Sequence, residues 1–220
     1  MPYRKVPLAQ DSIYHIYTKS IAGYKIFNYA KDYKRMIETI DFYTVGDPPC
    51  KFSLFLQKKN KPKSNIPQPY SLKSERIVKL LAYCIMPTHI HLILQQIKKN
   101  SISRYMNLIL KSFTKYYNVK CKRKGPLWES RFKNALIETD EQLLHLTRYL
   151  HLNPVTAHMV EKPQLWHASS YNEYLMKCDD KDKICRYDDV LDINPTSYRK
   201  FVEDQISYQR TLKEIKDLVL

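Results

Sequence analysis

The stretch Met86-Pro-Thr-His89-Ile-His91-Leu-Ile-Leu94 places two histidines one residue apart at the beginning of an apolar run. Successive side chains of a β-strand point to opposite faces, so His89 and His91 share one face and the isoleucine between them takes the other. Two imidazoles on one face have the geometry of a metal clamp, although such a pair also occurs as an ordinary part of a strand. Pro87 cannot donate to a sheet ladder, so it marks a turn that puts the pair at one end of a sheet.

Outward from this stretch, the spacing of apolar residues predicts alternating strands and helices. Runs of β-branched and aromatic residues predict strands over residues 12–20, 77–86, 89–95 and 133–138. Helical spacing predicts helices over residues 28–43, 101–120 and 141–153, with Ser101 and Asp140 as N-caps and Pro154 as the stop. Residues 51–57 fit either a helix or an edge strand. This order predicts an α+β fold in which a small antiparallel sheet carries helices on one face.

Two further segments complete the organisation of the chain. Residues 58–74 are rich in Lys, Pro, Asn and Ser, which is typical of a basic loop insertion. Residues 188–193 and 197–220 read as helices. We therefore expect one domain over residues 1–160 and a helical C-terminal extension over residues 161–220.

The charge balance indicates a polyanionic partner. The 220 residues include 37 Lys and Arg against 22 Asp and Glu, a net charge of +15, and nucleic acid is the first candidate. The 18 tyrosines and 7 phenylalanines supply rings on which bases stack. Residues 120–132 combine a cationic run, a Gly-Pro turn and a Trp/Arg/Phe group, although a charge run alone is often just a solvated face.

Cysteine usage and the N-terminal residues indicate a compartment. The 5 cysteines are odd in number and form no Cys-x-x-Cys pair, so neither a disulfide framework nor a zinc ribbon is indicated. Residues 1–11 lack the apolar core of a signal peptide, and no apolar run is long enough to span a membrane. We expect a cytoplasmic protein without a membrane partner.

The third expected helix carries polar side chains along one stripe. His145, Tyr149 and Asn153 recur at intervals of four residues, which places them on one side of a helix. Tyr149 offers a phenol and Asn153 an amide oxygen, a possible nucleophile beside a possible metal ligand. A tyrosine at this spacing is also a common packing residue, so the pattern alone does not select Tyr149, and we expect His145 to pack.

Four ordered motifs carry a resemblance to a known family: Met86-Pro-Thr-His-Ile-His-Leu-Ile-Leu, Gly125-Pro-Leu-Trp-Glu-Ser-Arg-Phe-Lys, Arg148-Tyr-Leu-His-Leu-Asn-Pro-Val and Trp166-His-Ala-Ser-Ser-Tyr-Asn-Glu-Tyr. Together they strongly resemble the REP-associated tyrosine transposases, a group of the single-strand HUH transposases, over about residues 12–175. The family commonly has Asn before the first histidine, where this chain has Thr88. The fold we expect is accordingly a ferredoxin/RRM-like antiparallel sheet of about four strands.

The resemblance assigns the site residues. His89 and His91 match the metal-binding histidines, Tyr149 the nucleophile, and Asn153 the polar residue that completes the metal site. Imidazole and amide ligation suits Mg²⁺ or Mn²⁺. The implied activity is cleavage and rejoining of single-stranded DNA through a 5′-phosphotyrosine, which conserves the energy of the phosphodiester bond.

Family members often read short hairpins, so the implied partner is hairpin-containing single-stranded DNA, and the resemblance favours a monomer over a homodimer. Trp128 and Arg131 lie within a family motif, and the other candidates are chosen for their charge. The candidate DNA contacts are Arg104, Lys111, Lys115, Lys122, Arg123, Lys124, Trp128 and Arg131.

Two other hypotheses account for the same residues. A non-catalytic DNA-binding protein would keep the sheet, the aromatic residues and the charge without cleaving DNA. A metal-dependent hydrolase would use water as its nucleophile and leave Tyr149 as a packing residue. A covalent link between protein and DNA distinguishes both from the transposase reading, because only a tyrosine nucleophile leaves one.

Overall fold

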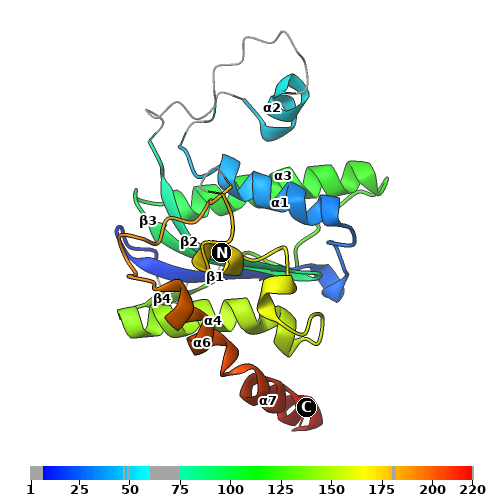
Figure 1. The fold of residues 1–220 in the computed structure, drawn as a ribbon. Helices are drawn as coiled ribbons and strands as arrows, with labels where there is room; N and C mark the ends of the chain where they lie inside the picture. Colours follow the sequence, from blue (N-terminus) through cyan, green and yellow to red (C-terminus); the bar gives the residue numbers. More distant parts are fainter. Residues whose placement is uncertain (1–6, 47, 49, 60–74, 180–181, 220) are drawn as a thin grey trace.

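A computed structural model describes residues 7–46, 48, 50–59, 75–179 and 182–219 of the chain. At its centre lies a four-stranded antiparallel sheet in the order β2-β3-β1-β4 (Figure 1). The strands are β1 (Ile13–Lys19), β2 (Val78–Met86), β3 (His89–Gln96) and β4 (Lys133–Ile137). The expected α+β fold and its four strands are confirmed.

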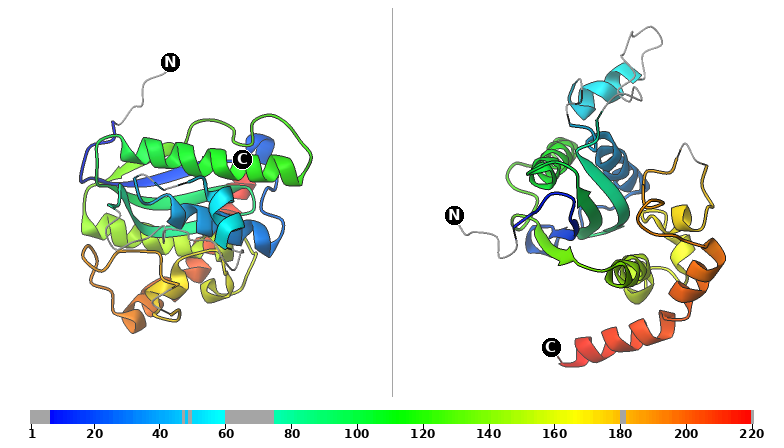
Figure 2. Two further views of the ribbon diagram at one scale, coloured as in Figure 1. Left: turned by 90° about the horizontal axis from the view of Figure 1, so that it is seen from above. Right: turned by 90° about the vertical axis from the view of Figure 1, so that its left-hand side faces the viewer.

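Helices cover both faces of this sheet, and the placement on one face alone was wrong. In Figures 1 and 2, α1 (Ala30–Phe42) and α3 (Ser101–Lys120) lie on one face, and α4 (Asp140–Thr156) lies on the other. The reason is the apolar content of the central hairpin, because nearly every residue of β2 and β3 is buried, on both faces. A strand that is apolar on both faces needs cover on both.

The β2–β3 hairpin brings the histidine pair to the end of the sheet, as the sequence predicts. Met86 pairs with His89 across the turn that Pro87 and Thr88 form. The Pro87 carbonyl accepts the Ile26 amide at 2.8 Å, which ties the turn to the segment before α1. The first residues of β3 are thereby held between β2 and β1.

Strand β1 alternates between a buried and a half-buried face. Tyr14, Ile16 and Thr18 are at most 4% exposed and point toward the layer of α1 and α3. The other face carries His15 and Tyr17, which are half-buried. Polar and aromatic side chains of β1 thus lie on the α4 side of the sheet.

The ends of two helices differ from the expectation. Asn100, with a φ of 61°, precedes α3, and Ser101 is the first helical residue rather than the cap. Thr139 caps α4 by accepting the Gln142 amide at 3.1 Å, so Asp140 is also a first-turn residue. Helix α4 continues past Pro154 to Thr156. A proline removes one hydrogen bond, and Pro154 is buried here, so its packing in the core holds the last turn.

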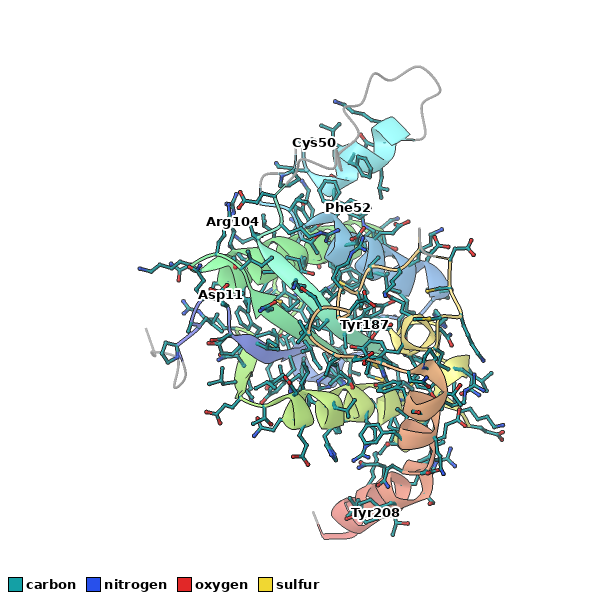
Figure 3. The ribbon with its side chains drawn as sticks, turned by 60° about the vertical axis from the view of Figure 1, so that its left-hand side comes forward. Asp11, Cys50, Phe52, Arg104, Tyr187 and Tyr208 are labelled. Carbon is teal, nitrogen blue, oxygen red and sulfur yellow. The ribbon has the colours of Figure 1, made fainter. Side chains whose placement is uncertain are left out.

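Residues 51–57, whose sequence fits either a helix or an edge strand, are helical from Phe52 onward. Helix α2 (Phe52–Lys59) packs through Phe52 against Phe42 of α1, with ring centroids 4.9 Å apart. Phe52 is labelled in Figure 3. The expected basic insertion, 58–74, begins inside α2, and its residues 60–74 lie outside the described part of the chain.

The C-terminal part combines extended segments with short helices. Residues 188–193 form a turn and irregular chain rather than the expected helix, and Asn194 caps the next helix by accepting the Ser197 amide at 3.0 Å. The expected helix over 197–220 is divided at residues 204–205. The elements after α4 are η2 (Pro163–Leu165), α5 (Tyr171–Tyr174), α6 (Pro195–Glu203) and α7 (Ile206–Val219).

This segment is part of the core. The Ile85 amide of β2 donates to Ala168 at 2.9 Å, and the Arg186 amide donates to Leu80 at 2.8 Å, so residues on both sides of α5 line the outer edge of β2. Tyr198 of α6 is only 3% exposed. In the described part of the chain, no helix is long and apolar enough to cross a membrane.

Candidate functional site

A cavity on the α4 side of the sheet brings together three of the four residues that the family resemblance assigns. His89 and His91 reach it from β3 and Tyr149 from α4. The rings of His89 and His91 lie 5.0 Å apart, and the Tyr149 ring meets His91 edge-on at 6.1 Å between centroids. The cavity measures about 470 Å³ and is lined by His15, Tyr17, Lys19, His89, His91, Ala135 and Tyr149.

Burial sets the charge state of these groups. It lowers the pKa of His91 to about 2 and that of His89 to about 4, with a further contribution from the positive charge of Lys19. Both imidazoles are therefore neutral near pH 7 and keep a lone pair, as a metal ligand requires. Burial also raises the pKa of the Tyr149 phenol above its ordinary value, so the phenol is protonated near neutral pH.

Two neighbouring side chains hold the histidines through the same ring atom. His91 Nδ1 lies 2.9 Å from His15 Nε2, and His89 Nδ1 lies 2.8 Å from Thr88 Oγ1. The sequence reasoning did not single out His15 as a site residue. The signal that could have found it is the alternation of β1, which puts His15 on the same face as Tyr17.

Asn153 lies one helical turn beyond Tyr149 and does not line the cavity. Its Nδ2 atom is buried and has no hydrogen-bond partner among the residues that the structure describes. Among the residues that the structure describes, no three His, Cys, Asp or Glu side chains gather as a metal site. The structure thus gathers two neutral imidazoles and the Tyr149 phenol at the cavity, and it leaves Asn153 outside the residues that line it.

The two histidines of α4 have packing contacts. His145 Nδ1 lies 2.8 Å from Arg148 Nη2, and its ring packs edge-on against Phe201 of α6. His151 is fully buried between Tyr198 and Ser170. These contacts anchor α4, the helix that carries Tyr149.

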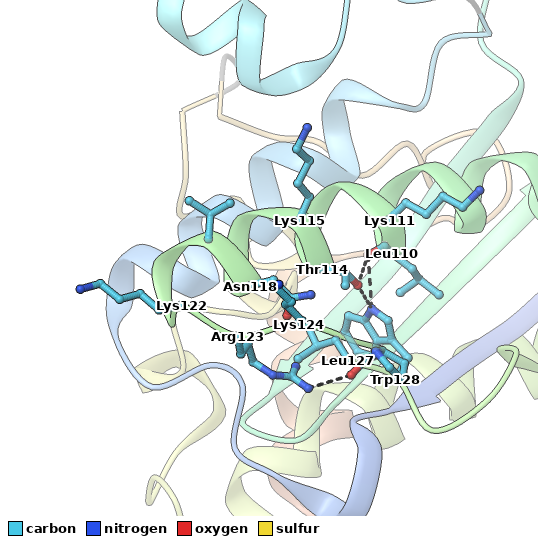
Figure 4. A pocket seen from close by; sticks show the side chains of 12 residues that line it. Leu110, Lys111, Thr114, Lys115, Asn118, Lys122, Arg123, Lys124, Leu127 and Trp128 are labelled. Atoms are coloured by element: carbon cyan, nitrogen blue, oxygen red, sulfur yellow. Dashed lines mark hydrogen bonds between the residues drawn. The ribbon is translucent and has the colours of Figure 1, made fainter.

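A second hollow, which we call the α3 groove, contains six of the eight candidate DNA contacts. It lies along the second half of α3 and the loop that follows, and its volume is about 730 Å³ (Figure 4). Arg104, labelled in Figure 3, is in the first turn of α3. Neither Arg104 nor Arg131 lines the groove. The lining residues are Leu110, Lys111, Thr114, Lys115, Asn118, Val119, Lys122, Arg123, Lys124, Pro126, Leu127 and Trp128.

The α3 groove is lined by both apolar and cationic side chains. The Trp128 indole N–H donates to Thr114 Oγ1 at 3.1 Å and to the Leu110 carbonyl at 3.3 Å, so its polar edge is used within the protein (Figure 4). Val119 also lines the groove and is 72% exposed. Arg123 donates to the Pro126 carbonyl, which closes the loop.

The α3 groove is joined to the histidine cavity by the end of β1. The Glu129 amide donates to the Lys19 carbonyl at 3.0 Å, and Trp128 forms a bridge with Ser20. The side chain of Lys19 lines the cavity, while that of Trp128 lines the groove. The backbone contacts of Lys19 and Ser20 with Trp128 and Glu129 therefore connect a residue that lines the cavity to a residue that lines the groove.

Comparison with known proteins agrees with this architecture. Residues 65–153 match the family model of the IS200-like transposases. Over these residues, which are fewer than half of the 220 in the chain, the sequence is similar to the IS200-like transposases.

Within that class the similarity is to the REP-associated tyrosine transposases. A putative member from Haemophilus influenzae is 30% identical over 102 residues, which are 42% of this chain and 58% of the relative. The chain thus matches little more than half of that relative's length. A solved structure of a REP-associated tyrosine transposase bound to a REP hairpin superposes with a TM-score of 0.51 at 16% identity, covering 89% of this chain and 96% of that one. This likeness establishes a shared fold.

Proposed function

We propose that this chain is a metal-dependent single-stranded DNA transposase or endonuclease that cleaves and rejoins DNA through a 5′-phosphotyrosine. One observation carries the proposal: the phenol of Tyr149 projects from a helix into the cavity that holds the neutral His89 and His91. The similarity to REP-associated tyrosine transposases supports the same reaction.

In the proposed reaction, Tyr149 Oη attacks the phosphorus of the scissile phosphodiester. The Oη–P bond forms as the bond from phosphorus to the 3′ oxygen breaks, the phenol proton leaves to solvent, and the 3′ oxygen gains a proton. Attack by the free 3′-OH reverses these changes and rejoins DNA without an external energy source.

The surroundings of Tyr149 define what its activation requires. Burial raises the pKa of the phenol, so positive charge must offset the loss of its proton. Lys19 supplies one such charge at the cavity. A divalent cation, Mg²⁺ or Mn²⁺, held by His89, His91 and Asn153 would supply charge that polarises the phosphate.

We assign DNA binding to the α3 groove. Its lysines provide affinity for backbone phosphates, and Trp128 provides an aromatic surface for an unpaired base. We propose that the substrate is single-stranded DNA with a hairpin, and its crossing from the groove to the cavity would follow the junction at Lys19. Arg104 and Arg131 would contact DNA outside the groove.

We propose that the chain acts as a monomer whose C-terminal segment, residues 161–220, secures the tyrosine helix. Arg148 of α4 stacks over the Phe201 ring of α6 at 4.2 Å. Arg210 of α7 donates to the carbonyls of Val155 and Val160 at 3.3 and 3.4 Å. These contacts fix α4 to its own chain, as a site built within one protomer requires.

Covalent trapping tests the proposal. Purified protein is incubated with labelled single-stranded DNA carrying the hairpin next to its own gene, with Mn²⁺ or EDTA, and separated on a denaturing gel. We expect a metal-dependent protein–DNA band that is lost in Tyr149→Phe. Tyr17→Phe is the matched control, because Tyr17 lines the same cavity with its ring 6.0 Å from His91. Cleavage without a covalent band would instead indicate a hydrolase, and binding without cleavage a DNA-binding protein.

A further inference from the structure

Both candidate ligand histidines are held by hydrogen bonds at Nδ1 and at no other ring atom among the described contacts. His91 Nδ1 faces His15 Nε2 at 2.9 Å, and these two rings stack with centroids 5.1 Å apart and planes 15° from parallel. His89 Nδ1 faces the Thr88 hydroxyl at 2.8 Å. The repeated use of Nδ1 leaves Nε2 of each ring available.

The direction of these hydrogen bonds decides whether the rings can bind a metal. A neutral imidazole has one N–H and one lone pair, and the hydrogen bond made by one nitrogen fixes the state of the other. If His91 Nδ1–H donates to His15, the Nε2 lone pair of His91 is free for a cation. If His15 donates instead, the proton of His91 lies on Nε2 and blocks it. The same choice applies to His89 and the Thr88 hydroxyl, which can donate or accept.

We propose that His15 and Thr88 are positioning residues that accept from Nδ1 of His91 and His89, so that both histidines present Nε2 lone pairs to a divalent cation. This inference rests on the proposed function. Such partners of ligating histidines fix the tautomer and the ring orientation. Thr88 thereby takes a role at the position where the family commonly has Asn, a residue that can also accept a hydrogen bond.

The first test reads the tautomers directly in the complete chain. Long-range ¹⁵N–¹H spectra of the histidine rings distinguish Nδ1–H from Nε2–H imidazoles without metal or DNA. We expect His89 and His91 as Nδ1–H tautomers in the wild-type protein. In His15→Phe, which removes the acceptor, we expect the tautomer of His91 to redistribute while that of His89 stays. Nε2–H tautomers at both histidines in the wild-type protein would overturn the inference.

The second test measures Mn²⁺ binding by calorimetry in paired variants. His15→Phe and Thr88→Val remove the acceptors, and we expect each to weaken Mn²⁺ binding about 10- to 100-fold. His15→Gln offers an amide oxygen in place of the ring nitrogen, and Thr88→Ser keeps the hydroxyl, so both variants retain an acceptor and should recover most of the affinity. Unchanged binding in the first pair, or equal losses in both pairs, would contradict the proposal. DNA affinity in EDTA serves as the folding control, and a covalent adduct on Tyr149 tests the reaction separately.

Discussion

His151, on the helix that carries Tyr149, makes the unfolding free energy of the protein depend on pH. Its ring lies two residues after Tyr149 on α4 and is 0% exposed. Nδ1 is 2.8 Å from the Tyr198 hydroxyl and Nε2 is 2.9 Å from the Ser170 hydroxyl, so both nitrogens are bound inside the protein. Burial lowers the pKa of His151 from 6.5 to about 3.

The sign and size of the effect follow from this shift. Between pH 6.5 and 3 the unfolded chain binds a proton at His151 that the folded chain does not. Above pH 6.5 the unfolding free energy is therefore not reduced by His151. As the pH falls from 6.5 toward 3, the unfolding free energy decreases by up to ~1.4 kcal/mol per pH unit. The expected contribution is a loss of about 1.4 kcal/mol at pH 5.5 and about 2.7 kcal/mol at pH 4.5.

Urea unfolding of the wild-type protein and of His151→Gln measures this contribution. Glutamine keeps hydrogen-bonding capacity and does not titrate, and the other titrating groups are common to both proteins. We expect the loss of unfolding free energy from pH 7.5 to pH 5.5 to be smaller in His151→Gln by about 1.4 kcal/mol. Equal pH dependence in His151→Gln and the wild-type protein would refute the reasoning.

Three further predictions concern the α3 groove and the ion pair between Asp32 and Lys120. Lys111→Gln with Lys115→Gln should lower the slope of log affinity for single-stranded DNA against log salt by about 1.4, as expected for two phosphate contacts, and an unchanged slope would exclude these contacts. Binding is measured for a set of oligonucleotides that each carry one abasic site at a different position. One position should weaken binding to the wild-type protein by about 1–3 kcal/mol, and Trp128→Leu should remove this dependence on position. Equal binding of all these oligonucleotides to the wild-type protein would exclude base stacking in the groove. Asp32 is fully buried and accepts from Lys120 at 2.5 and 2.7 Å. Asp32→Asn should therefore reduce the unfolding free energy by about 3 kcal/mol. A loss below about 1 kcal/mol in urea titration would show that the pair is not stabilising.

Local patterns were sufficient to predict most of the sheet. The alternation over β1 and the Pro87 turn depend on residues near one another in sequence, and both predict the observed strands. The layer to which α4 belongs depends on contacts with β2, a strand more than fifty positions earlier, and the sequence pattern did not reveal it. The extension of α4 past Pro154 likewise depends on burial, which opposes the local tendency of proline to end a helix.

The site was predictable where residues share an element and less so where they do not. Strand alternation places His89 and His91 together, and the family resemblance selects Tyr149 among 18 tyrosines. The contact between His15 and His91 crosses from β1 to β3, and it depends on the register that pairs Ile93 with His15 and Tyr17 with His91. That register is a property of the folded sheet, so His15 could be placed on the right face but not beside its partner.

The most direct test of the central claim is the position of the covalent bond. The trapped protein–DNA adduct is digested with protease and nuclease, and mass spectrometry locates the nucleotide. The account predicts a 5′-phosphate joined to Tyr149, with the released DNA fragment ending in a 3′-OH. A nucleotide joined to Tyr17, or cleaved DNA with no joined tyrosine, would contradict it.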